Sequence, residues 1–178
     1  MRTIVFITTL MLLPAGAARA QDVTLPKSLE RLADKAVQSV NVTVDGALLQ
    51  LAAKFLSPND PEQRAVKSLI GSLKGIYVRS FEFAVPGEYT PADVESLRSQ
   101  LKEPAWTRMA SVRSRKEAED VDVFFKMEKE RIAGVVVIAV QPRVLTFVNI
   151  VGPIDLEQLA SLGGQFGIPN LQIERPRK

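Results

Sequence analysis

The chain has 178 residues, of which 23 are Lys or Arg and 20 are Asp or Glu, and it contains neither histidine nor cysteine. The missing residue types exclude an imidazole base, a thiol nucleophile and a redox disulfide, and they remove the commonest zinc ligands. A formal net charge of +3 is far from the strong basic excess of nucleic-acid-binding proteins, so we expect no nucleic-acid partner.

The first twenty residues have the pattern of a secretory signal peptide. Arg2 supplies a positive start, residues 4–13 form an apolar core, and residues 18–20 are a small-x-small cleavage signal. The apolar core is about half as long as the ~20 residues that a membrane-spanning helix needs. We therefore expect export, cleavage between Ala20 and Gln21, and a soluble periplasmic or secreted protein with no integral membrane anchor.

Cleavage would leave a length that suits one domain with its own core. We assign residues 1–20 to the signal peptide, residues 21–172 to a single α+β domain, and residues 173–178 to a basic tail that we expect to be disordered. Because there is no cysteine, no lipid-modified cysteine can anchor the chain and no disulfide can stabilise it.

The N-terminal half predicts alternating helices and strands. Residues 26–37 have an amphipathic helical pattern, and residues 40–44 alternate valine with polar residues, as a half-buried strand does. A second helix is predicted over residues 47–56. Asp60 and Pro61 then begin a third, because a capping residue followed by proline is a typical helix start.

The next predicted elements are a strand, a helix and another strand. Residues 76–85 have strand character and are ended by a Pro-Gly pair. Thr90 begins a helix in the manner of a capping box, with Asp93 in place of the usual Glu or Gln. Residues 106–115 are predicted as the strand that follows.

Residues 120–152 predict three consecutive strands. The first alternates apolar and polar residues, which is typical of a strand with one buried face. Residues 135–140 are all apolar and mostly valine, so we expect an interior strand that is covered at least in part on both faces. Residues 144–151 form the last strand. The connections are short, which makes neighbouring strands antiparallel.

After this meander, Asp155 is a helix cap, and Ile154 and Leu159 have the spacing of a hydrophobic staple. Gly163 and Gly164 would end that helix. The whole order predicts an α+β fold: a mostly antiparallel sheet of about five or six strands, with helices packed on one face and a C-terminal four-strand meander.

Acidic residues cluster at the entrance to the meander: Glu117, Glu119, Asp120 and Asp122. Two of them could act as an acid/base pair or bind calcium. The alternative is a charged hairpin turn that stays solvated and discourages pairing at the sheet edge. We favour the solvated turn, because the spacing of a calcium-binding loop is absent.

Four cations lie on or beside the preceding strand: Arg108, Arg113, Arg115 and Lys116. They could form an anion-binding face, but we favour a solvated face paired with Glu128 or Asp122. The glycine-rich stretch at residues 163–167 follows a helix instead of preceding one, so it lacks phosphate-binding geometry. The sequence thus points to no catalytic, cofactor-binding or metal-binding residue, and we expect no cofactor.

Three stretches resemble a bacterial exported family, catalogued as domain of unknown function 4252. They are residues 75–83 (GIYVRSFEF), residues 134–139 (GVVVIA) and residues 145–159 (LTFVNIVGPIDLEQL). The resemblance covers roughly residues 40–162. Its motifs are a strand, a turn and a helix cap, so the resemblance implies kinship and carries over no catalytic or ligand residue.

Two classes of function remain. The first is an exported, non-catalytic binding or interaction module of the bacterial cell envelope, whose partner is an envelope protein or a small ligand. A variant of it is a carrier for a small apolar ligand held between helices and sheet. The second is a carboxylate-dependent hydrolase, which would need two buried carboxylates converging in a pocket.

Overall fold

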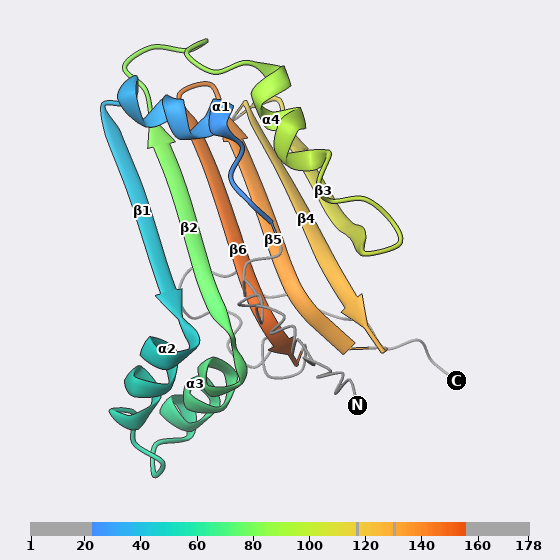
Figure 1. Cartoon of the computed structure of the whole chain (residues 1–178). Coiled ribbons are helices and arrows are strands. Elements are labelled where there is room, and N and C mark those ends of the chain that lie inside the picture. The colour runs from blue at the N-terminus through green and yellow to red at the C-terminus, as the bar shows by residue number, and fades with distance from the viewer. Residues whose placement is uncertain (1–22, 117, 130, 156–178) are drawn as a thin grey trace, which may run out of the picture.

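A computed structural model describes residues 23–116, 118–129 and 131–155. Within them the chain forms one six-stranded antiparallel sheet of order β1-β2-β6-β5-β4-β3 (Figure 1). The helices are α1 (Lys27–Glu30), the 3-10 helix η1 (Arg31–Asp34), α2 (Gly46–Lys54), α3 (Pro61–Ser72) and α4 (Pro91–Arg98). The strands are β1 (Gln38–Asp45), β2 (Gly75–Glu82), β3 (Trp106–Ser114), β4 (Glu119–Glu128), β5 (Arg131–Gln141) and β6 (Val144–Ile154).

The predicted fold class is confirmed, including the four-strand meander β3–β6. The valine-rich β5 is an interior strand, paired on one side with β4 and on the other with β6. The turn between β5 and β6 is Pro142-Arg143, so the strands it joins must be antiparallel neighbours. The capping box of α4 is also present, with Thr90 and Asp93 each accepting a backbone hydrogen bond from the other.

One face of the sheet, called here the closed face, lies under α1, η1 and α4. Its strand residues are fully or almost fully buried, and they pack against Leu29, Leu32 and Leu97 of the three helices. The aromatic and aliphatic strand residues of this core are Phe81, Trp106, Phe124, Val136, Ile138, Leu145 and Phe147. This layer is the main hydrophobic core of the protein.

The closed face also buries one neutral polar side chain. Asn149 of β6 is fully buried, beside Tyr77 of β2 and Val136 of β5 in the strand register. Neither of its amide atoms has a hydrogen-bond partner. Because a buried amide without a partner costs about 1–3 kcal/mol, Asn149 is a weak point in an otherwise apolar layer.

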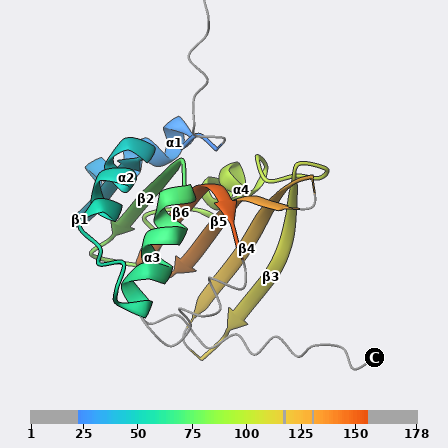
Figure 2. The same cartoon turned by 90° about the horizontal axis from the view of Figure 1, so that it is seen from below.

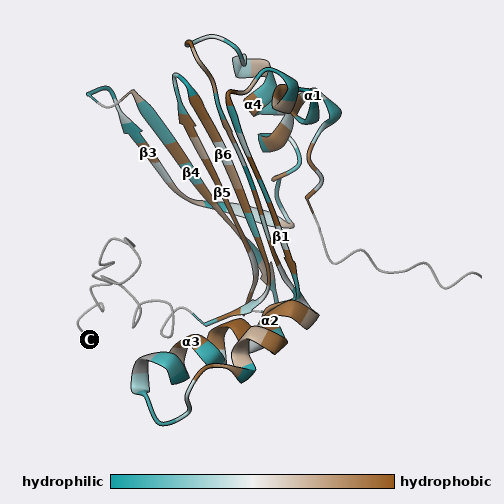
Figure 3. Ribbon diagram, turned by 90° about the vertical axis from the view of Figure 1, so that its left-hand side faces the viewer, coloured by the Kyte–Doolittle hydropathy of each residue, from teal (hydrophilic) through white to brown (hydrophobic). Residues whose placement is uncertain are grey.

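The opposite face, called here the open face, is covered only at its lower end, by α2 and α3. Leu49 of α2 and Leu73, just after α3, contact a second apolar cluster that includes Ile76 and Ile150. Figure 3 shows the two groups of helices at opposite ends of the sheet and on opposite sides of it. The expectation that all helices gather on one face is therefore corrected.

The cause of this division lies at the end of β1. Asp45 is the last residue of β1 and also the N-cap of α2, accepting a hydrogen bond from Leu48 N at 2.9 Å. No loop intervenes that could carry α2 back to the closed face. The first helix is also shorter than predicted: α1 and η1 together end at Asp34, and Val37 donates its backbone N–H to Glu82 O at 2.8 Å.

The C-terminal end of α3 packs closely against the end of β6. Lys74 N donates to Val151 O at 2.7 Å, and Ser72 Oγ donates to Pro153 O at 3.1 Å. Gly152 lies between them with a φ of 130°, and a Cβ there would lie 2.8 Å from the Leu73 Cα. Only glycine fits both this backbone conformation and this close approach.

Several predicted segments lie outside the described residues. They are the signal peptide, the helix that Asp155 would begin, the glycine-rich stretch and the basic tail. Among the residues that are described, no helix has the length and apolar character to cross a membrane.

Candidate functional site

The predicted acidic cluster does not form a single site. Side chains alternate between the faces of β4, so Asp120 and Asp122 point to the closed face and Glu119 points to the open face. Glu119 accepts a hydrogen bond from Gln141 Nε2 at 2.9 Å. Glu117 lies outside the described residues. An acid/base pair of Glu119 with Asp122 is therefore impossible, because the sheet separates them.

Asp122 is buried, and the expectation that it stays solvated is wrong. It is 1% exposed, and its carboxylate lies 2.5 Å from Arg98 Nη2 of α4 and 3.8 Å from Arg108 Nη1 of β3. Burial alone would raise its pKa. The Ser111 hydroxyl and the two guanidinium groups outweigh that effect, so the pKa of Asp122 lies below its usual value. A charged pair under α4 is thus part of the closed face.

The predicted pairing of cations across the hairpin is confirmed in part. Arg108 is near Asp122, as predicted, whereas Arg113 pairs with a residue that was not predicted, its Nη1 lying 2.7 Å from Asp120 Oδ2. Glu128 pairs instead with Lys126 of its own strand, at 3.0 Å. Arg115 and Lys116 are exposed. Across the described residues, no three acidic side chains are grouped so that they could hold a metal ion.

An apolar row crosses the open face from one sheet edge to the other. The strand register places one residue from each strand side by side, and five of the six are valine. This valine row consists of Val42, Val78, Val148, Val137, Val123 and Ala110. All six are half-buried or exposed, and Val42 at the edge is 40% exposed. Such a continuous apolar strip is characteristic of a binding surface.

Next to the valine row, α3 and the strands β3 to β6 border an open, largely apolar groove of about 810 Å³. In Figure 2, which views the molecule from below, α3 lies in front of the sheet near β6, and β4 and β3 lie to its right. Ser68 and Ser72 of α3 line one wall, and Arg131 and Asp155 are the charged residues of the lining. The apolar lining comes from Met109, Phe125, Met127, Ile132, Pro153 and Ile154.

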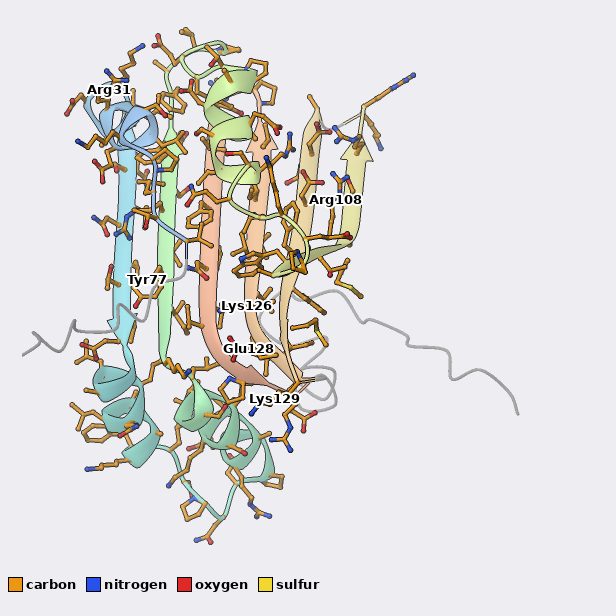
Figure 4. All side chains as sticks on the ribbon, turned by 45° about the vertical axis from the view of Figure 1, so that its right-hand side comes forward. Arg31, Tyr77, Arg108, Lys126, Glu128 and Lys129 are labelled. Atoms are coloured by element: carbon orange, nitrogen blue, oxygen red, sulfur yellow. The ribbon has the colours of Figure 1, made fainter. Side chains whose placement is uncertain are left out.

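A basic pocket of about 970 Å³ lies at the lower end of the sheet, on the closed-face side, since Lys126 and Glu128 share the parity of Phe124, and it meets the groove around that end. Its described lining carries four cationic side chains and one carboxylate: Lys74, Lys126, Lys129, Arg131 and Glu128. Figure 4 shows Lys126, Glu128 and Lys129 together at the lower end of β4. The hydrogen bond from Lys126, with the nearby charges of Lys74 and Lys129, lowers the pKa of Glu128. The pocket is therefore an electropositive site.

Sequence reasoning missed both the groove and the basic pocket. Each is built by residues far apart in the chain, since α3 packs beside the end of β6 and the β4–β5 turn. One local signal was available. Met109 and Met127 are exposed by 57% and 45% at strand positions, and exposed methionine is common at surfaces that bind apolar groups.

The chain was compared with protein families, with curated proteins and with solved structures. No curated protein and no solved structure matches it. One family model, described as a domain of unknown function (DUF4252), matches residues 31–162, which include every strand of the sheet and all of the groove-lining residues. The match covers most of the sequence, and on that basis this chain is a member of the DUF4252 family.

Proposed function

We propose that this protein is an exported, non-catalytic binding module of the bacterial cell envelope that holds an apolar group on the open face of its sheet. The observation that carries the proposal is the continuity between the valine row and the apolar groove. Val123 of the row and Phe125 of the groove are neighbours on the same face of β4. A ligand in the groove could therefore extend onto the valine row along apolar side chains of the same strand.

The chemistry of the groove supports binding of a flexible apolar chain. Met109 and Met127 have unbranched, polarizable side chains that adapt to different shapes. A volume of about 810 Å³ falls within the range of small-molecule sites, which is about 300–1,000 Å³. The groove is open along the sheet, so the ligand would lie across the surface and would not be enclosed in a sealed cavity.

The arrangement of the acids favours binding over hydrolysis. A carboxylate-dependent hydrolase needs two carboxylates that face one substrate. Asp122 is the single buried carboxylate among the described residues, and Arg98 neutralises it beneath α4. The groove-lining carboxylate, Asp155, is exposed and on the other side of the sheet.

Titration with the neutral fluorescent probe N-phenyl-1-naphthylamine tests the binding site. We expect saturable binding to the purified chain, weakened about fivefold or more in Met109→Ser/Met127→Ser, because apolar contact area is lost. Val85→Ser is the matched control. Val85 is exposed between β2 and α4, outside both the valine row and the groove, so this variant should bind the probe like the parent.

Adding Val42→Ser to these variants separates an apolar ligand from a large protein partner. A partner that covers the whole valine row would lose affinity on Val42→Ser as well. Failure of the probe to bind, or equal binding by the parent and the double methionine variant, would overturn the groove as the site. Cell fractionation with mass spectrometry of the N-terminus tests export, and a mature chain that begins at Gln21 is expected.

A further inference from the structure

We propose that the ligand of the groove is a single-chain amphiphile with an anionic head group, whose chain lies in the groove and whose head is held by the cations of the basic pocket. This inference rests on the proposed function, since it assigns a ligand class to the same groove. It is carried by two observations: the two sites share part of their lining, and their chemistries are complementary halves of such a molecule.

The groove, on the open face, and the basic pocket, on the closed-face side, meet around the lower end of the sheet, and the residues at that end form a wall common to both. Arg131, Ile132 and Pro153 line both of them. Ile132 is buried and presents an apolar surface to the groove, whereas Arg131, the first residue of β5, is exposed. A chain packed against Ile132 would therefore bring its head group to the Arg131 guanidinium, which can bind carboxylate or phosphate through two hydrogen bonds.

The charge around this wall favours a negative head group. Four cations line the pocket, against Glu128 in the pocket and Asp155 in the adjoining groove, so the net charge around this wall is +2 (4 − 2). Lys74 and Lys129 line the same pocket as Glu128, and their charges add to the hydrogen bond from Lys126 in lowering the pKa of Glu128. An excess of cations at one opening attracts an anion and repels a cationic head group.

The groove by itself does not favour a negative head group over a neutral or positive one. Its described charged lining is Arg131 opposite the carboxylate of Asp155, which together are close to neutral. Selection of the head group must therefore come from the basic pocket, and selection of the chain from the groove. This separation allows each half to be tested by changing one part of the ligand or one side of the wall.

The experiment uses ligands that share a dodecyl chain and differ in the head: dodecyl phosphate, dodecanoate, dodecanol and dodecyltrimethylammonium. Affinities are measured by displacement of N-phenyl-1-naphthylamine and by calorimetry, below the micelle concentration. We expect both anions to bind about tenfold or more tightly than dodecanol, and the cation to bind most weakly. Inorganic phosphate distinguishes a free anion from a head group, and it should bind far more weakly than dodecyl phosphate.

Substitutions in the wall shared by the groove and the basic pocket form the second part of the experiment. Lys129→Asn/Arg131→Gln should lose about tenfold or more in affinity for dodecyl phosphate and leave dodecanol unchanged. Asn is chosen because Lys129 has a φ of 48°, which Asn tolerates. Arg115→Gln/Lys116→Asn removes two exposed cations at the other end of β4 and should change neither affinity. If the first pair fails to fold, Arg131→Gln alone makes the same test.

The outcomes separate this inference from the proposed function. Equal binding of dodecanol and dodecyl phosphate, unaltered by the wall variants, would overturn the anionic head and leave the apolar site standing. If none of the dodecyl ligands binds, both the anionic head group and the apolar site are overturned. Binding that appears only after Leu159→Ser would identify residues 156–178 as the occupant of the groove, and a dimer that dissociates in Met109→Ser/Met127→Ser would identify a second copy. Either result would overturn the amphiphile.

Discussion

The two faces of β5 carry similar residues but have very different surroundings. Val136 and Val137 are adjacent and chemically identical, yet Val136 is completely buried under the helices of the closed face and Val137 is half-buried in the valine row. The closed face uses large aromatic residues that fill space beneath α1 and α4, whereas the open face presents a strip of small branched residues. The first layer forms the main core, and the second is covered only in part, by α2 and α3.

The sharpest test of this contrast is a charge placed on each face in turn. Val136→Asp should populate the unfolded state heavily, because a carboxyl group without partners in the core, ionised or protonated, costs several of the ~5–15 kcal/mol that stabilise a typical domain. Val137→Asp should lower the melting temperature but still give a cooperative transition, since water reaches that face. Circular dichroism melts would measure both, and equal loss in the two variants would contradict the distinction between the faces.

The next largest effect on stability is expected at the ion pair between Arg98 and Asp122. Arg98→Ala should destabilise the protein by about 3–5 kcal/mol, because Asp122 would remain buried without its nearest cation. Arg108→Ala is the control. Its side chain is half-exposed and 3.8 Å from the carboxylate, so a loss of about 0.2–1 kcal/mol is expected in urea unfolding. Similar losses in both variants would show that the two arginines share the charge equally.

The same pair should make stability depend on pH in the acidic range. The folded-state pKa of Asp122 is lowered, so its contribution is complete above its unfolded-state pKa of about 3.9 and is lost as the pH falls through the folded-state value. Asp122→Asn should therefore be less stable than the parent near neutral pH and lose less stability on acidification. Parallel acid profiles for the two proteins would refute this assignment.

A smaller, stabilising effect is expected within the closed face. Asn149→Val removes a buried amide that has no hydrogen-bond partner, and it should raise the free energy of unfolding by about 1–3 kcal/mol. Asn41→Val on the exposed edge strand β1 is the matched control, with a change of about 0.5 kcal/mol or less. Destabilisation by Asn149→Val would mean that the amide makes an interaction the closed face needs.

The smallest effect on stability should come from the open face. Val42→Thr and Val112→Thr should change the free energy of unfolding by no more than about 0.5 kcal/mol, because both side chains are 40% exposed or more. A loss above about 1 kcal/mol in urea unfolding would show that this face is buried in the native protein, for example against a second copy.

Periodicity predicted most of this fold, because local pattern is enough to place strands and short turns. The valine run in β5 and the turn at Pro142 required a meander, and alternation in β4 required one buried face. Alternation also contained the correct answer for Asp122, which shares its parity with the core residue Phe124. Because the sequence analysis treated the acidic residues as one cluster and did not separate them by face, it did not predict that Asp122 is buried.

The candidate site could not be predicted in the same way. The groove requires α3 to lie beside β6 and β4, and no sequence pattern specifies which face a helix pair will cover after leaving β1. The basic pocket likewise joins Lys74, which follows α3, to Lys129 in the β4–β5 turn. Contacts between residues so far apart depend on tertiary packing, which a single sequence does not display.

The junction at Gly152 has a consequence for how a ligand would reach the groove. The 2.7 Å hydrogen bond between Lys74 and Val151, together with the close approach at Gly152, attaches the C-terminal end of α3 rigidly to the sheet. The α3 wall of the groove is therefore fixed to the sheet at this end. We expect a ligand to enter through the open side of the groove, along β3 and β4, without a movement of α3.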